Sequence, residues 1–216
     1  SGYANFVTFK NDLYLKIAQN FLNYRWFLTY LYGASPLAEE GFLKDAPTTP
    51  VRSFRNSPYG YVNKEDVTVS FANLDTYVTN LEDAVATGKL SAEKEFYAAV
   101  RLRGSQYNRD YLTHGISYLE FRCFDLNPFN PLGINQETLD TVHLFILSLL
   151  WMDSLTDVDT HLAQANHLNN QIALSHPLET LPKEADIQSI LIAMKEVITH
   201  FDLGPEYAHL LETVKK

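Results

Sequence analysis

Apolar side chains recur at helical spacing along residues 5–32 and predict a long amphipathic helix there. Gly33 follows directly, as is typical of a helix end. The segment 36–70 is rich in proline and glycine and predicts loops. A second helix is expected over residues 72–87, ended by Gly88.

Two later stretches alternate between apolar and polar side chains, which is the period of a half-buried strand. In Phe96–Gly104, one face carries Phe, Ala, Val and Leu, and the other carries Tyr, Ala and Arg. In Tyr118–Leu126, one face carries Leu119, Phe121 and Cys123, and the other carries Tyr, Glu and Arg. The pattern therefore predicts two strands, each with an apolar side and a polar side.

The rest of the chain returns to helical periodicity. Helices are expected over residues 136–153, 155–175 and 185–202, and a short last helix begins at Pro205. Together with the two strands, this order predicts an α+β fold in which helices pack around a small antiparallel sheet.

Composition narrows the class of protein. The 216 residues are 46% hydrophobic, so the chain can build a sizeable core. With 17 basic and 26 acidic residues the net charge is −9, which argues against a nucleic-acid partner but leaves room for a local basic pocket. The longest apolar run, LFILSLLWM, is about half of the roughly 20 residues that cross a membrane, so no membrane segment is expected. The lone Cys123 fits a reducing cytoplasm and reads as a buried structural thiol.

Glu120 and Arg122 stand two positions apart on the polar face of the second predicted strand, about 7 Å from each other. One interpretation is a solvated face whose charges pair with neighbours. The other is a Mg²⁺–phosphate site, because a carboxylate binds the hard cation and an arginine fork holds phosphate oxygens. Arg101 and Arg103 of the first strand would add positive charge if the two polar faces align.

Four blocks of sequence carry a resemblance to a known family. They are YRWFLTYLYGASP (24–36), SFRNSPYGYVNK (53–64), EFYAAVRLRG (95–104) and GISYLEFRCFDLNPFNPLGI (115–134). The last block is the most specific, with its Tyr-Leu-Glu-Phe-Arg-x-x-Asp-Leu-Asn-Pro-Phe pattern. The chain resembles bacterial glutamate–cysteine ligase, including the ligase half of the bifunctional glutathione enzymes.

The resemblance implies a fold similar to the glutamine synthetase catalytic sheet and an ATP- and Mg²⁺-dependent ligation of L-glutamate to L-cysteine. In that reaction the γ-carboxylate of glutamate is phosphorylated, and the cysteine amine attacks the acyl phosphate. Glu120 matches a metal-binding glutamate, and Arg122 matches an arginine that contacts the transferred phosphoryl group. The residues that the resemblance assigns to substrates are Tyr30, Tyr97, Arg101, Arg55 and Arg25.

Family members are longer, so the 216 residues resemble the C-terminal portion of the catalytic domain, with site blocks in 24–134 and a helical tail in 135–216. We expect such a portion to be inactive alone and to self-associate through an open sheet edge. Two alternatives stay open at this point: a non-catalytic ligand-binding or interaction domain, and a related carboxylate–amine ligase with another amine acceptor.

Overall fold

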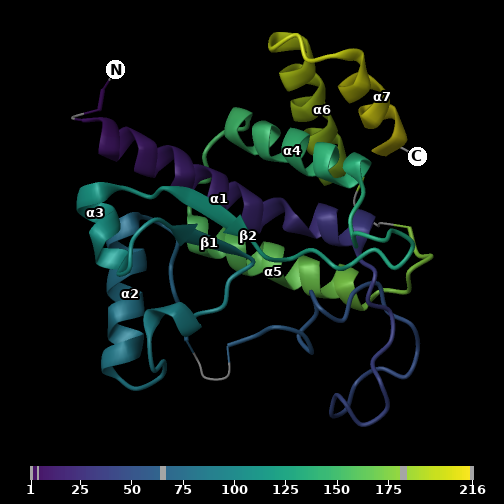
Figure 1. Ribbon diagram of the computed structural model, residues 1–216, viewed down its shortest axis with the longest axis horizontal. Helices are drawn as coiled ribbons and strands as arrows, with labels where there is room; N and C mark the ends of the chain where they lie inside the picture. Colours follow the sequence, from purple (N-terminus) through teal and green to yellow (C-terminus); the bar gives the residue numbers. More distant parts are fainter. Residues whose placement is uncertain (1, 4, 64–66, 181–183, 215–216) are drawn as a thin grey trace. The chain divides into compact units, whose positions relative to one another are not determined.

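The computed structural model describes residues 2–3, 5–63, 67–180 and 184–214. Lys64, the last residue of the second sequence block, lies outside these ranges. The elements in chain order (Figure 1) are α1 Phe6–Tyr32, α2 Leu74–Ala86, the 3₁₀ turn η1 Glu93–Glu95, β1 Val100–Arg103, the 3₁₀ turn η2 Asn108–Asp110, α3 Tyr111–His114, β2 Tyr118–Phe121, α4 Gln136–Trp151, α5 Val158–Leu174, α6 Glu184–His200 and α7 Pro205–Val214.

The chain divides into two compact units, and each is described by itself. The first unit comprises residues 1–23, 61–123 and 154–166, and the second comprises residues 24–60, 124–153 and 167–216. Both α1 and α5 contribute residues to each unit.

The helices predicted from sequence are confirmed, and the local chemistry explains where they begin. The side chains of Asn73 and Asn135 cap α2 and α4 by accepting from the amides of Thr76 and Thr138, both at 2.8 Å. A side-chain oxygen at this position satisfies an amide that has no partner within the helix. Among the described residues, no helix combines the length and apolar character needed to cross a membrane.

In the first unit, β1 and β2 form a two-stranded antiparallel sheet. The paired residues are Val100–Phe121, Arg101–Glu120, Leu102–Leu119 and Arg103–Tyr118. Val100 and Leu102 are buried, and the ring of Phe121 packs at 4.5 Å from that of Phe21 in α1. The α+β fold class and the apolar face of each strand are therefore confirmed, as is the burial of Cys123.

The predicted lengths of the two strands were wrong. The first was expected over Phe96–Gly104, but β1 covers only Val100–Arg103, and residues 96–99 between the turn η1 and the strand are not part of the paired register. The second was expected to reach Leu126, but β2 ends at Phe121 and one further bond, from the amide of Arg122 to the carbonyl oxygen of Ala99 (2.8 Å), closes the ladder. Alternation in sequence continues on both sides of the paired region and therefore does not mark where pairing stops.

In the second unit, α4 packs against both α6 and α7 (Figure 1). Leu144 and Phe145 of α4 are buried, as are Ile190 and Met194 of α6. The ring of Phe145 stacks on that of Phe27, at 6.0 Å between centroids. This core therefore packs against the C-terminal part of α1.

Candidate functional site

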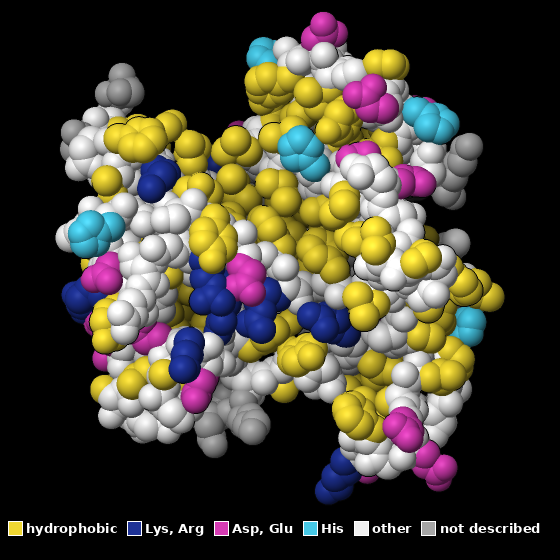
Figure 2. Space-filling view, in the orientation of Figure 1, with side chains coloured by type: hydrophobic (Ala, Val, Ile, Leu, Met, Phe, Trp, Pro, Cys, Tyr) yellow, Lys and Arg dark blue, Asp and Glu magenta, His cyan; other side chains and the backbone are white. Residues whose placement is uncertain are grey.

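The polar face of the β1–β2 sheet gathers the charged residues that the sequence singled out. Arg101 stands directly opposite Glu120, and Arg103 stands opposite Tyr118. The alignment of the two polar faces, on which the added positive charge of Arg101 and Arg103 depended, is thus confirmed. Figure 2 shows this face as dark blue side chains around a magenta one, over the two strands.

Glu120 lies between two arginines. Its Oε2 accepts from Nε of Arg103 at 2.6 Å, and its Oε1 lies 3.6 Å from Nε of Arg122. The side chains of the three residues keep about a third of their surface exposed, at 36%, 36% and 33% for Glu120, Arg103 and Arg122. The hydrogen bond to Glu120 is the main cause that raises the pKa of Arg103.

Arg101, unlike Arg103, donates its hydrogen bonds to backbone carbonyl oxygens. Its guanidinium donates to the carbonyl oxygen of Phe96, at 3.2 Å from Nε and 2.6 Å from Nη2, and also to that of Lys94. Burial, followed by the charges of Arg122 and Arg103, lowers the pKa of Arg101. These contacts hold the turn before β1, and the predicted role of Arg101 in substrate binding stays a prediction.

Arg122 is supported by an aromatic stack. Its guanidinium carbon lies 5.5 Å from the ring centroid of Tyr97, and the ring of Tyr61 stacks on Tyr97 at 5.6 Å. A planar guanidinium stacked over a ring face is held in one plane, and its edge can meet a planar or tetrahedral anion. Tyr97 therefore lies beside Arg122, as a shared site requires.

The charges on this face do not cancel. The guanidinium groups of Arg103 and Arg122 lie beside the carboxylate of Glu120, and Arg101 stands opposite it on the other strand. Three arginines and one glutamate give this cluster excess positive charge within a chain of net charge −9. Such a local basic surface attracts an anion, and guanidinium forks are suited to phosphate or carboxylate oxygens. The arrangement can therefore bind and orient an anionic substrate group.

The other three predicted site residues, Tyr30, Arg55 and Arg25, belong to the second unit. Tyr30 contacts Arg52, which the sequence analysis did not single out. The guanidinium carbon of Arg52 lies 4.5 Å from the ring centroid of Tyr30, and Nη1 donates to the carbonyl oxygen of Tyr30 at 3.3 Å. This contact could not be predicted from the sequence, because nothing in the sequence marks Arg52 as buried.

Arg55 and Arg25 are both half-buried. The amide of Arg55 donates to Oγ of Ser35 at 3.1 Å, and Ser35 in turn donates to Asp125 at 2.9 Å. Asp125 falls in the most specific sequence block but was assigned no role from the sequence. Arg25 lies within α1, and its part in substrate binding stays a prediction.

The side chains of the described residues show which of them could ligate a metal ion. Across residues 2–3, 5–63, 67–180 and 184–214, no group of three or more His, Cys, Asp or Glu side chains gathers as a metal site. Glu120 is a single carboxylate, and one of its oxygens accepts from Arg103. It fits one protein ligand of a Mg²⁺ ion whose other ligands are nucleotide oxygens and water, the usual mode for this cation.

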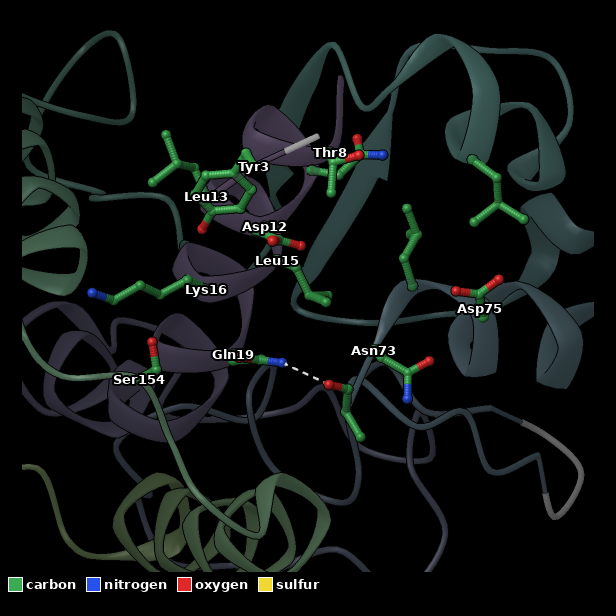
Figure 3. A pocket seen from close by; sticks show the side chains of 14 residues that line it. Tyr3, Thr8, Asp12, Leu13, Leu15, Lys16, Gln19, Asn73, Asp75 and Ser154 are labelled. Carbon is green, nitrogen blue, oxygen red and sulfur yellow. Dashed lines mark hydrogen bonds between the residues drawn. The ribbon is translucent and has the colours of Figure 1, made fainter. Parts of the chain in front are cut away.

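A separate hollow of about 500 Å³ lies in the first unit between α1 and the beginning of α2 (Figure 3). Asp12, Lys16 and Gln19 of α1 line it, with Asn73 and Asp75 facing them. None of the residues predicted to bind substrate, phosphate or metal lines this hollow. It is therefore distinct from the polar face of the sheet.

Comparison with known proteins places the chain in a family. The family model for glutamate-cysteine ligase matches residues 2–91 and 87–172. The glutathione biosynthesis bifunctional protein GshAB of Streptococcus mutans is 62% identical over 216 residues, and that of Streptococcus agalactiae is 59% identical over 212 residues. The chain is covered to 100% and 98%, but it spans only 29% and 28% of these relatives' lengths.

Two crystal structures share the fold. A bifunctional glutathione synthetase from Pasteurella multocida superposes with a TM-score of 0.92 at 40% identity, covering 99% of this chain and 28% of that one. A glutamate–cysteine ligase from Francisella tularensis, in complex with AMP, superposes with a TM-score of 0.78 at 22% identity, covering 95% of this chain and 51% of that one. The second likeness speaks for the fold alone. From the family match and the highly identical relatives, the chain belongs to the glutamate-cysteine ligase family.

Proposed function

We propose that the chain carries part of the active site of an ATP-dependent ligase that joins the γ-carboxylate of L-glutamate to the amine of L-cysteine. The product is γ-glutamylcysteine, formed through γ-glutamyl phosphate, as the first step of glutathione synthesis. The observation that carries the proposal is the register of β1 and β2, which puts Glu120, Arg101 and Arg103 on one face, with Nε of Arg122 3.6 Å from the Glu120 carboxylate. Membership of the glutamate-cysteine ligase family supports ATP as the phosphate source.

In this proposal Arg122 contacts the oxygens of the phosphoryl group as it passes from ATP to glutamate. Negative charge spreads over those oxygens in the transition state, and a preorganised guanidinium stabilises it without reorganising. Tyr97 holds the guanidinium of Arg122 from one face, at 5.5 Å. Because the aromatic ring limits the orientations of the fork, the arginine meets the phosphoryl group already aligned.

Glu120 is proposed as a Mg²⁺ ligand on the same face. The ion, when bound, would neutralise charge on the ATP phosphates. The bond from Arg103 to Oε2 fixes the carboxylate while its Oε1 lies toward Arg122. Arg103 thereby becomes a supporting residue of the site, although the sequence suggested only that it adds charge.

Tyr30, Tyr97, Arg55, Arg101 and Arg25 remain the proposed substrate-binding residues. Within the second unit, Arg52 holds Tyr30, and the Ser35 hydroxyl holds the backbone of Arg55. The site blocks in 24–134 are proposed to carry the chemistry, and the helical segment 135–216 to support them.

The test is an assay of the protein translated from its complete reading frame. It should convert ATP, L-glutamate and L-cysteine to ADP and γ-glutamylcysteine in the presence of Mg²⁺, and ADP release should depend on cysteine. Turnover with another amine but not with cysteine would point to a related carboxylate–amine ligase. Calorimetric binding of ATP–Mg²⁺ without any turnover would leave a ligand-binding module and contradict the proposal.

A further inference from the structure

We propose that Asp125 is a positioning residue that aligns the backbone of the Arg55 segment for substrate binding. Asp125 lies in the loop that follows β2, within the second unit. The inference rests on the proposed function for its kinetic consequence, and on hydrogen bonds of this chain for its structural one.

One oxygen of Asp125 accepts three hydrogen bonds. The donors are the amide of Ala34 at 2.8 Å, Oγ of Ser35 at 2.9 Å and Oγ of Ser53 at 2.7 Å. We call Asp125, Ser35, Ser53 and the amide of Ala34 the Asp125 cluster. Hydrogen bonds to an ionised acceptor are shorter and stronger than neutral ones, so this carboxylate is a firm anchor.

The cluster sets the direction of two further bonds. A serine hydroxyl has one proton to donate and lone pairs to accept with. Since Ser35 and Ser53 each donate their proton to Asp125, their lone pairs are left to face the amides that follow. Ser35 accepts from the amide of Arg55 at 3.1 Å, and Ser53 accepts from the amide of Asn56 at 3.1 Å.

The two serines also lie on neighbouring chain segments. Ser35 and Ser53 form a parallel bridge, and the amide of Phe54 donates to the carbonyl oxygen of Ser35 at 2.8 Å. Ser53 is completely buried. The carboxylate, itself only partly buried, therefore joins the segment after α1 to the segment that carries Arg55.

The sequence gives this arrangement a functional context. Asp125 is three residues from Arg122 along the chain, and Ala34 is four residues from Tyr30. The Asp125 cluster thus connects, through short stretches of backbone, to an arginine proposed for the phosphoryl group and a tyrosine proposed for substrate. A residue that acts in this way touches no substrate and works through Arg55.

The experiment uses the protein translated from its complete reading frame, with the variants Asp125→Ala, Asp125→Asn and Ser35→Ala. The matched control is Asp159→Ala, because Asp159 also accepts from a serine hydroxyl, that of Ser70 at 2.8 Å, but in the other unit. Two readouts are taken: hydrogen–deuterium exchange of the amides at positions 34, 55 and 56, and the separate KM values for glutamate, cysteine and ATP.

We expect Asp125→Ala to speed exchange at all three amides by about tenfold or more, the scale of a lost bond to a charged acceptor. Asp125→Asn keeps an accepting oxygen and should rescue part of this loss, and Ser35→Ala should speed exchange at Arg55 more than at Asn56. The KM for an amino-acid substrate should rise by about tenfold in Asp125→Ala, with a smaller change in kcat. A purely structural role would lower the active fraction, and hence the apparent kcat, at constant KM.

Unchanged exchange and unchanged KM in Asp125→Ala, beside an active parent protein, would overturn this inference alone. Equal effects of Asp125→Ala and the control Asp159→Ala would also overturn it. An unaltered protein that makes no γ-glutamylcysteine would instead overturn the proposed function and, with it, the kinetic half of the inference.

Discussion

Glu120 forms its hydrogen-bonded ion pair with Arg103, its diagonal neighbour across the sheet, and not with Arg101, which stands directly opposite. The Arg103–Glu120 bond is 2.6 Å long, whereas the guanidinium of Arg101 turns to the carbonyl oxygens before β1. Cross-strand neighbours of opposite charge stabilise a sheet only modestly. The pair therefore matters more for the orientation of Glu120 than for the stability of the fold.

Replacing Glu120 by glutamine should remove most of the ligase activity and leave folding nearly intact. A neutral amide binds Mg²⁺ poorly, and the loss should be on the order of a hundredfold, as when one preorganised electrostatic contact is removed. Because the ion pairs are partly exposed, the free energy of unfolding should fall by no more than about 1 kcal/mol. The control is Glu82→Gln, which breaks the exposed pair with Arg109. Activity within about threefold of the parent would end the metal assignment.

Replacing Arg52 by lysine should destabilise the second unit. The guanidinium stacks on Tyr30 and donates to the carbonyl oxygens of His176 at 3.2 Å and Glu179 at 2.6 Å. A lysine cannot stack or reach these acceptors together, and unmade buried bonds cost about 1–3 kcal/mol. Urea denaturation of Arg52→Lys beside the exposed Arg109→Lys measures the difference. Equal unfolding free energies for the two variants would show that the bonds of Arg52 do not stabilise the second unit.

The buried amide of Asn169 should matter more for stability than any exposed amide of α5. It donates to the carbonyl oxygen of Asn56 at 2.9 Å and accepts from the hydroxyl of Thr29 at 2.8 Å. In Asn169→Ala, the hydroxyl of Thr29 and the carbonyl oxygen of Asn56 each lose a buried hydrogen bond. This loss should lower the free energy of unfolding by about 1–3 kcal/mol. The exposed Gln171 on the same helix supplies the control Gln171→Ala. A loss no larger than that of the control would contradict the assignment.

The helices and the two-faced strands were predictable because each depends on local periodicity. The end of α1 before Gly33 and of α2 before Gly88 follow from residue types next to the helix. The shared polar face of Arg101 and Glu120 could be predicted from the alternation of each strand, given a register that pairs polar positions with polar positions.

The rest depends on contacts between residues far apart in the sequence. Asp125 meets Ser35 across 90 positions, and Arg52 meets Glu179 across 127. No periodic pattern encodes such pairs, so neither residue could be assigned a partner from the sequence. The predicted self-association through a sheet edge and the predicted inactivity of the 216-residue chain alone stay predictions, to be measured by light scattering and by the ligase assay.

The turnover number of Arg122→Lys, measured in the protein translated from its complete reading frame, tests the central claim most directly. Lysine keeps the charge but loses the planar fork that Tyr97 aligns, so kcat should fall by about 10²–10³, or ~2.7–4 kcal/mol, at an unchanged melting temperature. Arg109→Lys, an exposed arginine outside the site, should keep the parental kcat. If Arg122→Lys kept the parental kcat and only the KM for cysteine rose, Arg122 would not act on the phosphoryl group.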